Sequence, residues 1–418
     1  MSAPARFAAT LLVLAAFVPA PTPAHAEDAG ADTAAVTHAE LERILEGYTE
    51  QIQTMTSDLD KLKRVKFSGY LQARWETSEN SSDSVKVAGN PYAVTSPNLG
   101  RFYIRRGRLK MTYDSSPLSQ AVFYVDGGTD RTIRLLEAYV TLMDPWTALH
   151  RHQLTIGQQN VPFGYEIERS SSVRELPERS KAENVLFSGE RDRGVKLVDQ
   201  WTDRFQTTVA LVNGGGINHV DFPNTDPTKA KDVLARARWS QGWFDAAASY
   251  YTGRNVTPLT GPDVATDKTR VGFDAQLFYA LPRAGGGTLR GEWYGAHEVN
   301  PDSVKALVVA PTAANPVRLL APGANPGHLA TDAEGWYVMW VQNAGDRAQG
   351  VARYDRWDPN TDLAHDQFER WSLGVNYFWD GFTRITLSYD AIRTETKSGA
   401  QYVDPEDNLW TLQVQHKW

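Results

Sequence analysis

The stretch WSLGVNYFWDGFTRITLSYDA, residues 371–391, shows the pattern that decides the fold. In WSLGVNYFW (371–379) large apolar side chains occupy every second position, with mostly polar or small ones between them. The alternation resumes in TRITLSYDA (383–391) after the short connection DGF. A period of two residues is that of a β-strand whose faces meet different surroundings. The stretch therefore predicts two antiparallel strands joined by a tight turn, each with an apolar and a polar face.

The same alternation recurs along most of the chain, for example in FSGYLQARW (67–75), VGFDAQLFY (271–279) and LWTLQVQHKW (409–418). We count sixteen such segments, and an even count returns the end of a membrane barrel to the side where it began. We therefore expect an all-β fold, a sixteen-stranded antiparallel transmembrane β-barrel over residues 66–418. The predicted strands lie near 66–76, 101–113, 118–126, 133–142, 152–159, 193–199, 205–213, 232–240, 243–252, 270–280, 288–297, 335–342, 349–357, 369–379, 382–393 and 408–418.

The connections between these segments alternate in length. Those after odd-numbered strands are mostly long, and those after even-numbered strands are mostly tight turns such as QG and DG. A soluble β-sandwich would also have alternating strands, but it gives no reason for this parity. Long loops at one end and short turns at the other are typical of barrels in the bacterial outer membrane. The long connections are 77–100, 160–192, 214–231, 253–269 and 298–334.

Strand length and aromatic residues agree with a membrane-spanning barrel. Tilted strands need about 9–11 residues to cross a bilayer, and most of the segments have about that length. The chain has 13 Trp, 17 Tyr and 15 Phe, and many of them stand near the strand ends, where the two membrane interfaces would lie. The tryptophans expected in these girdles are Trp75, Trp239, Trp243, Trp357, Trp371, Trp379, Trp410 and Trp418.

The residues before the barrel have a different character. Residues 1–26 combine a single early charge, Arg6, with a short apolar run and the sequence AHA, which is the pattern of a secretory signal peptide. The apolar run is shorter than the about 20 residues of a spanning helix, so we expect cleavage rather than an anchor. Residues 27–65 are then a periplasmic leader that includes a helix.

Within this leader, residues 38–64 carry apolar side chains at alternating spacings of four and three. This is the a/d seam of a coiled coil, although an amphipathic helix lying on a barrel mouth would show a similar stripe. A helix this short is marginal alone, so we expect copies of the chain to stand close together already. The seam residues are Leu41, Leu45, Tyr48, Ile52, Met55, Leu59 and Leu62.

Composition argues against several other functions. The chain has no cysteine and a mild net charge of −7, so neither thiol chemistry nor a broad basic surface for nucleic acid is indicated. His150 and His152 flank one arginine without the further ligands that a metal site needs. The glycine-rich stretches 214–216 and 285–287 lack the lysine and helix of a phosphate-binding loop. We expect no cofactor and no enzymatic activity.

If the apolar faces meet lipid, the opposite faces line a polar lumen. In this phase eleven basic and six acidic side chains point inward, although the whole chain is acidic. A confined passage of low dielectric constant focuses the field of such an excess and concentrates anions. The basic residues are Arg74, Arg106, Arg108, Lys110, Lys196, Arg236, Arg238, Arg270, Arg290, Arg370 and Arg384, and the acidic residues are Asp126, Glu137, Asp245, Asp274, Glu292 and Asp390.

Two groups of residues are the candidates for anion contact. Arg106, Arg108 and Lys110 share one face of one strand, so an anion could step along them. The connection 160–192 places basic groups beside hydroxyl donors, and a loop folded into the lumen would set its narrowest point. In the competing interpretation these charges pair with neighbouring carboxylates and only brace the wall. The loop candidates are Arg169, Ser170, Ser171, Ser172, Arg174, Arg179 and Lys181, which lie among several glutamates.

Five motifs in order resemble the phosphate-selective porin O and P family: RFYIRRGRLKM (101–111), LLEAYVTLMDP (135–145), LTIGQQNVPFGYE (154–166), LPERS (176–180) and RDRGVKL (191–197). The resemblance covers roughly residues 66–200. It implies a sixteen-stranded homotrimer, an arginine ladder and a constriction made by an inward-folded third loop. By match, Arg105 and Arg106 fall on the family's paired arginines, and Arg169 to Arg174 on its basic, serine-rich loop. The loop is richer in glutamate than a strongly phosphate-selective pore should be, and Glu137 stands where the family often has aspartate.

Together these patterns predict a porin in the outer membrane of a Gram-negative bacterium, through which small anions such as phosphate diffuse passively. The alternative is a general, weakly selective porin whose lumen charges are mutually paired. A barrel enzyme would need a catalytic group at one rim, which we do not find at a convincing spacing, and an adhesion barrel would have a plugged lumen. The residues expected to contact the anion are Arg74, Arg105, Arg106, Arg108, Lys110, Arg169, Ser171, Ser172, Arg174, Arg179, Lys196, Arg236, Arg238 and Arg270.

Overall fold

The computed structural model of the chain describes most of the predicted barrel and the helix before it. The predicted signal peptide, residues 1–26, and the leader up to residue 37 lie outside the described residues, as does much of the connection 298–334. The described residues are 38–79, 100–128, 132–217, 229–257, 264–300, 303–304, 307–309, 319–321, 323–398, 401–404 and 407–418.

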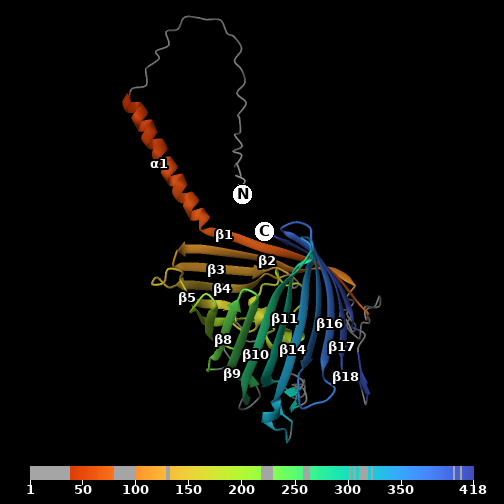
Figure 1. Ribbon diagram of the computed structural model, residues 1–418. Helices are drawn as coiled ribbons and strands as arrows, with labels where there is room; N and C mark the ends of the chain where they lie inside the picture. The colour runs from red at the N-terminus through yellow and green to blue at the C-terminus, as the bar shows by residue number, and fades with distance from the viewer. Residues whose placement is uncertain are drawn as a thin grey trace, which may run out of the picture. The chain divides into compact units, whose positions relative to one another are not determined.

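Within these residues, sixteen strands form one closed barrel in which each strand pairs antiparallel with its neighbours (Figure 1). The ring closes where β20 pairs with β1, with Lys417 opposite Tyr70. The strands are β1 (Val65–Ser78), β2 (Arg101–Ser116), β3 (Ser119–Asp126), β4 (Arg134–Met143), β5 (His152–Asn160), β6 (Arg191–Gln200), β7 (Phe205–Val212), β8 (Asp232–Gln241), β9 (Phe244–Thr257), β10 (Val264–Leu281), β11 (Gly285–Val299), β14 (Ala330–Ala344), β15 (Ala348–Asp358), β16 (Phe368–Phe378), β17 (Thr383–Thr394) and β20 (Leu409–Lys417).

Every one of the sixteen predicted strands coincides with a strand of the barrel, so the predicted fold class is confirmed. One predicted connection is wrong: 253–269 was expected to be long, but β9 and β10 extend into it and leave only 258–263 between them. The paired backbone continues there because Val264 still finds Thr257 opposite it. Two small separate sheets lie in later connections: β12 (Val308–Val309) with β13 (Leu319–Leu320), and β18 (Thr396–Ser398) with β19 (Gln401–Val403).

The alternation of the sequence becomes the division between the two faces of the wall. On β16, Trp371, Leu373 and Val375 are more than half exposed on the outside, whereas Ser372 and Asn376 are fully buried inside. The outward apolar face avoids a large penalty in lipid, where polar groups would lose their water. A tight connection such as 379–382 marks the turn end of the barrel, and the long connections mark the loop end.

One expected girdle residue faces the other way. Trp357 on β15 is 5% exposed and packs inside the barrel with Ala182 and Phe368, so its predicted place at the membrane interface is wrong. Trp371 and Trp410 do lie on the outer surface, about half exposed. The difference has a physical reason: a short helix enters the lumen beside Trp357 and gives its ring an apolar partner there.

The N-terminal unit contains the predicted helix, α1 (His38–Lys63). The seam residues Tyr48, Ile52, Met55 and Leu59 are all more than half exposed in the single chain. Among the described residues, no helix is long and apolar enough to cross a membrane.

Candidate functional site

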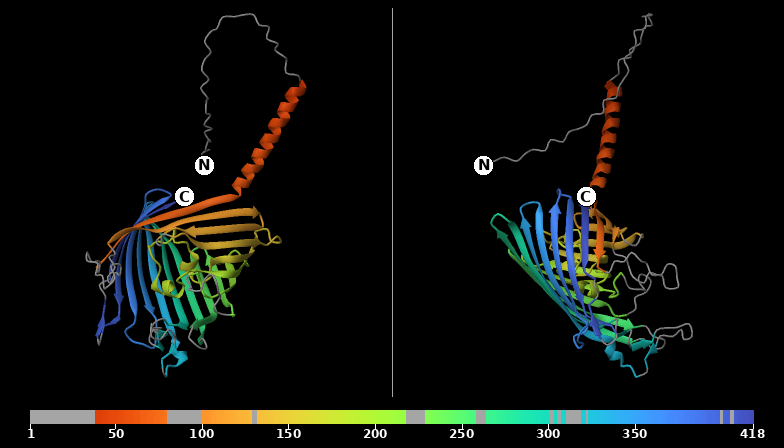
Figure 2. Two further views of the ribbon diagram at one scale, coloured as in Figure 1. Left: turned by 180° about the vertical axis from the view of Figure 1, so that it is seen from behind. Right: turned by 90° about the vertical axis from the view of Figure 1, so that its right-hand side faces the viewer.

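The connection between β5 and β6, residues 161–190, lies inside the barrel and is called the third loop here (Figure 2). It contains two short helices, α2 (Tyr165–Glu168) and α3 (Lys181–Leu186). Phe163 and Ile167 of this loop are fully buried and share one apolar cluster with Tyr294 of the wall. Each such side chain contributes about 1.5–3 kcal/mol when it leaves water. The predicted inward-folded third loop is therefore present, and an apolar part of the wall receives it.

The loop turns into the lumen at Gly164, whose φ of 62° is a conformation that favours glycine. A Cβ atom there would lie only 2.9 Å from the Glu292 carboxylate. That carboxylate accepts hydrogen bonds from the backbone N–H groups of Tyr165 and Glu166, both at 3.0 Å. Gly164 itself donates its N–H to Ser249 Oγ at 3.2 Å. The wall thus fixes the first turn of α2 in place.

Farther along, arginines of the wall hold the backbone of the third loop. Arg353 Nη1 donates to the carbonyl oxygen of Glu178 at 3.0 Å, and Arg370 Nη2 donates to that of Arg179 at 2.6 Å. Both guanidiniums also pair with Asp355, at 3.3 and 2.8 Å. These two buried arginines satisfy loop carbonyls that could otherwise not meet water. Their role in the structure is to brace the loop.

Three of the predicted anion-contacting residues converge on one carboxylate of the loop. The nearest nitrogens of Arg74, Arg105 and Arg106 lie 2.6, 2.9 and 3.8 Å from Glu178. Burial alone would raise the pKa of Glu178, but the three guanidiniums outweigh it and hold the pKa well below its ordinary value. Glu178 is therefore ionised, and it neutralises part of the predicted ladder.

A β-bulge explains why two consecutive arginines reach the same side. Gln72 pairs with Arg106, but the next residue, Ala73, pairs with Ile104, so Arg105 is an extra residue in β2. Consecutive residues of a regular strand point to opposite faces, and a bulge changes the direction of one of them. The paired arginines of the sequence thus meet one glutamate.

The serine-rich part of the loop divides into bonded and open hydroxyls. Ser171 Oγ lies within hydrogen-bond distance of Tyr70 Oη and of Arg108 Nη1. Arg108 also pairs with Asp126 at 2.8 Å. Ser170 and Ser172, in contrast, bond to each other through their hydroxyls at 3.1 Å and line a cavity.

The next two loop arginines share Glu190. Arg179 Nη1 pairs with its carboxylate directly, and Arg174 Nη2 lies 3.8 Å from it. Burial, together with the charge of Arg179, lowers the pKa of Arg174 to about 10. At neutral pH Arg174 still carries its charge, and its contact with Glu190 is long.

Three further arginines of the predicted anion-contacting set are paired as well, whereas Arg384 of the predicted inward set has no carboxylate oxygen within 4.0 Å among the described residues. Arg236 contacts Asp274 at 2.6 Å, Arg238 contacts Asp245 at 2.6 Å, and Arg270 contacts Glu298. Arg169 of the third loop is exposed and lies over the ring of Tyr165, 4.9 Å from its centroid. Arg169 pairs with no carboxylate in the part of the chain that the structure describes.

The fully buried charges of the wall are nearly balanced, while predicted inward residues such as Lys110 and Lys196 are only half-buried and lie outside this group. Among the described strand residues that are buried and charged, ten are basic and nine are acidic. Four of the acidic ones were missing from the prediction because they lie at strand ends or were not counted: Glu76, Asp192, Asp232 and Asp355.

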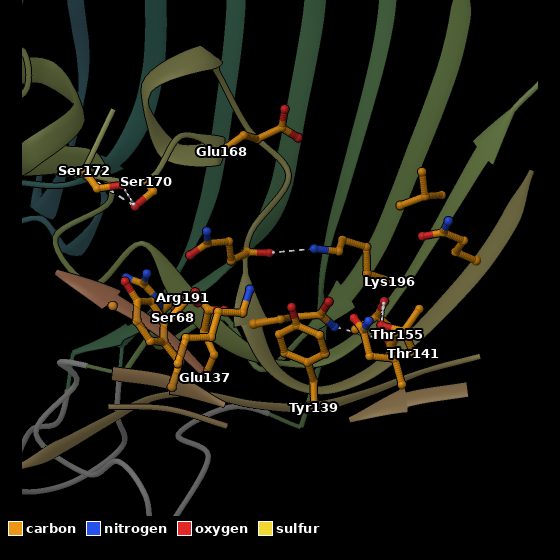
Figure 3. Close-up of a pocket in the computed structure, with 18 of the residues that line it drawn as sticks. Ser68, Glu137, Tyr139, Thr141, Thr155, Glu168, Ser170, Ser172, Arg191 and Lys196 are labelled. Carbon is orange, nitrogen blue, oxygen red and sulfur yellow. Dashed lines mark hydrogen bonds and ion pairs between the residues drawn. The ribbon is translucent and has the colours of Figure 1, made fainter. Parts of the chain in front are cut away.

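The open charge lies elsewhere, in a cavity of about 590 Å³ on the turn side of the third loop (Figure 3). Its two side-chain carboxylates are both paired, Glu137 with Arg191 at 3.0 Å and Glu168 with Arg236 at 3.4 Å. Its basic side chains also include three lysines, and in the described chain none of them has a carboxylate oxygen within 4.0 Å. These are Lys110, Lys196 and Lys417.

Two of these lysines were predicted and one was missed. Lys110 and Lys196 were expected in the lumen, and Lys196 donates only to the backbone oxygen of Asn160, at 3.2 Å. Lys417 follows Gln413 and Gln415 at the spacing of the buried face, so its phase was visible in the sequence. Arg191 was missed because the predicted sixth strand began two residues after it. No group of three or more potential metal-ligating side chains occurs among the described residues.

Comparison with known proteins adds evidence on the fold. No family model matches the chain. No curated protein matches its sequence either. Solved structures do match. OmpT of Vibrio cholerae, an outer membrane protein in its trimer form, matches with a TM-score of 0.54 and 13% identity, over 85% of this chain and 99% of that one.

Two further matches are the outer membrane channel DcaP of Acinetobacter baumannii and an anion-selective porin from Comamonas acidovorans. DcaP has a TM-score of 0.54 and 13% identity over 85% of this chain and 97% of that one. The Comamonas porin has a TM-score of 0.53 and 11% identity over 85% and 99%. The chain has the porin fold. The predicted β-barrel fold is thereby confirmed, while the resemblance to the phosphate-selective porins stays a prediction.

Proposed function

We propose that this chain is an outer-membrane porin through which small anions, phosphate among them, diffuse passively. The observation that carries the proposal is the cavity on the turn side of the third loop. Lys110, Lys196 and Lys417 line it without a carboxylate partner among the described residues, whereas both of its side-chain carboxylates are paired with arginines. The free charge of the cavity is therefore positive.

The mechanism follows from this charge and from the polar lining. Three ammonium groups in a confined passage raise the local concentration of anions. Hydroxyls of Ser170, Ser172 and Thr155 also line the cavity and can replace part of an anion's hydration shell. Lysine holds its charge as a strongly hydrated point and does not grip two oxygens at once, so each contact is weak. Weak contacts spread over several sites let the ion leave.

The preference for phosphate is the finer part of the proposal. It is supported by the resemblance of roughly residues 66–200 to phosphate-selective porins, and by the arginines that reach the lumen. The pairing of Arg74, Arg105 and Arg106 with Glu178 weighs on the other side. This pairing favours the alternative, a general porin with little selectivity. One measurement distinguishes an anion-selective porin from a general porin.

That measurement is the reversal potential of the purified full chain in a planar bilayer under a KCl gradient. We expect an anion preference, and we expect most of it to disappear in the triple variant Lys110→Gln, Lys196→Gln and Lys417→Gln. The control is Lys66→Gln, which removes a lysine that already pairs with Asp114 at 2.8 Å. Block of the chloride current by low phosphate supports the phosphate preference. A cation-preferring or unselective pore contradicts the proposal and supports a general porin.

We also propose that the chain assembles as a homotrimer with a coiled coil formed by α1. Its exposed seam of alternating four- and three-residue spacing is the support, since an apolar stripe in water gains free energy when a second copy covers it. The matched Vibrio structure is of a trimer form.

The seam can be tested separately from the barrel. Ile52→Asp with Met55→Asp should lower the temperature at which the trimer dissociates on a semi-native gel. Thr54→Asp, outside the seam, should leave that temperature nearly unchanged. A wild-type chain that is monomeric in detergent and in lipid contradicts the trimer, and an unchanged dissociation temperature in the seam variant contradicts the coiled coil.

A further inference from the structure

The lumen contains a second cavity, of about 350 Å³, at the loop end of the barrel. Its lining includes Phe187 of the third loop and the strand ends at Thr257 and Val299. The first cavity lies toward the turn end, where its lining includes Met143 and Lys417, the last residues of β4 and β20. Of the described residues that line these two cavities, Arg191 is the one that belongs to both. The side chain of Arg191 therefore borders both cavities.

Two of the three guanidinium nitrogens of Arg191 are held by carboxylates. Nε donates to Glu137 Oε1 at 3.0 Å, and Nη1 donates to Glu190 Oε2 at 3.2 Å. The guanidinium also lies near the ring of Tyr124, 5.9 Å from its centroid. The third nitrogen, Nη2, donates to no atom of the described chain. The side chain is thus fixed in orientation while one donor edge stays open.

The charge of Arg191 is only partly neutralised. Glu190 contacts Arg179 and, at 3.8 Å, Arg174 in addition to Arg191, so one carboxylate is divided among three guanidiniums of the described chain. Glu137 has Arg191 as its ion-pair partner among the described residues. A charge-assisted donor that is held rigid and remains partly unneutralised suits an oxyanion that binds briefly and moves on.

We infer that Arg191 is a selectivity-determining residue of this pore in addition to the three lysines, the point at which an anion crosses between the two cavities through a transient hydrogen bond to Nη2. Glu137 is a positioning residue, which holds the guanidinium across the passage and limits its attraction for anions. The inference rests on the proposed anion channel, but it assigns a further selective step to a residue outside the three lysines.

The experiment measures single-channel conductance and reversal potential for four variants of the full chain in planar bilayers. Arg191→Gln keeps hydrogen-bond donors and removes the charge, and we expect chloride conductance at low salt to fall about fivefold, the size of a unit-charge interaction at 4 Å in water. Glu137→Gln should raise the anion preference above wild type. Arg191→Lys keeps the positive charge, so this variant should retain most of the anion preference of the wild type. Arg151→Gln is the matched control, because Arg151 pairs with Asp203 near the turn end and lines neither cavity.

The outcomes separate the inference from the proposed function. Anion preference in the wild type with unchanged conductance and reversal potential in Arg191→Gln overturns the inference and leaves the porin proposal standing. Higher conductance in Arg191→Gln without a change in reversal potential makes Arg191 a steric plug and overturns it too. If Arg191→Gln does not insert, Glu137→Gln decides, since an unchanged anion preference there also overturns the inference. A wild type without anion preference counts against the proposed function instead.

Discussion

Two regions of the lumen carry basic side chains, and they use them differently. Around Glu178 and Asp355, guanidiniums bond to carboxylates and carbonyl oxygens of the third loop and its surroundings. In the turn-side cavity, amino groups such as those of Lys110 and Lys417 have no carboxylate partner among the residues described. Arginine suits the first task because its planar fork makes several directed bonds at once, whereas lysine offers a compact charge. An inward-facing charge is therefore available to an anion where its neighbours leave it unbound or only partly neutralised.

The largest effect is expected where the bracing is removed. Asp355→Ala takes away the carboxylate that Arg353 and Arg370 share, and leaving buried charges without compensation costs about 3–5 kcal/mol. Urea unfolding of the barrel, followed by its heat-modifiable gel mobility, measures the loss. The control Asp346→Ala changes an exposed turn residue and should stay within about 0.5 kcal/mol of wild type. If Asp355→Ala and Asp346→Ala have equal stability, the pairing of Arg353 and Arg370 with Asp355 does not brace the third loop, and the comparison of bracing with free charge fails.

A smaller effect is expected when the bracing is converted into free charge. Glu178→Gln keeps the shape of the side chain but releases Arg74, Arg105 and Arg106 from their shared carboxylate. We expect anion preference to rise by roughly fivefold, about 1 kcal/mol, as for one unit charge at 4 Å in water. Reversal potentials at low and at about 1 M salt check this, because salt screens the effect. If stability falls while selectivity stays constant, these arginines serve the loop alone.

The smallest effect concerns pH, and two of the loop's carboxylates, those of Glu178 and Glu183, predict opposite behaviour. The pKa of Glu178 is held well below its ordinary value. The ionised carboxylate therefore stabilises the folded loop at every pH above the ordinary pKa of a glutamate, and this stabilisation is lost only at strongly acidic pH. Burial, with the charges of Glu292 and Glu166, raises the pKa of Glu183 well above its ordinary value. Protonated Glu183 therefore stabilises the folded loop at low pH, and this stabilisation is lost as pH rises through the raised pKa.

We expect current noise from a loosened third loop to grow toward alkaline pH and to change little in mildly acidic solution. Single-channel recordings across that range measure it. Glu183→Gln, which imitates the protonated acid and can keep the contact with Tyr294, should make the profile flat. If the current noise rises at acidic pH instead, the loss of the ionised Glu178 carboxylate, and not of protonated Glu183, loosens the third loop.

The sequence predicted the barrel well because the alternation within each strand is enough to tell its inward face from its outward face. The alternation in 371–391 places Ser372 and Thr386 inside without knowledge of any partner, and strand length follows from membrane thickness. The third loop was predicted to fold inward, but its contacts with the wall were not predicted. Which of its residues bond to the wall depends on contacts such as Arg290 with Glu175, between residues far apart in sequence. No local pattern encodes such a pairing.

The sequence by itself determined the sixteen strands, their inward and outward faces and the heptad seam of α1, because periods of two and of three to four depend on neighbours along the chain. Only the tertiary structure decided which inward charges remain free. Arg105 turns toward Glu178 through a bulge, Trp357 packs against Ala182 of α3 inside the barrel, and Arg191 borders two cavities. Each of these depends on what closure of the barrel brings together, and closure joins residues that the sequence keeps apart.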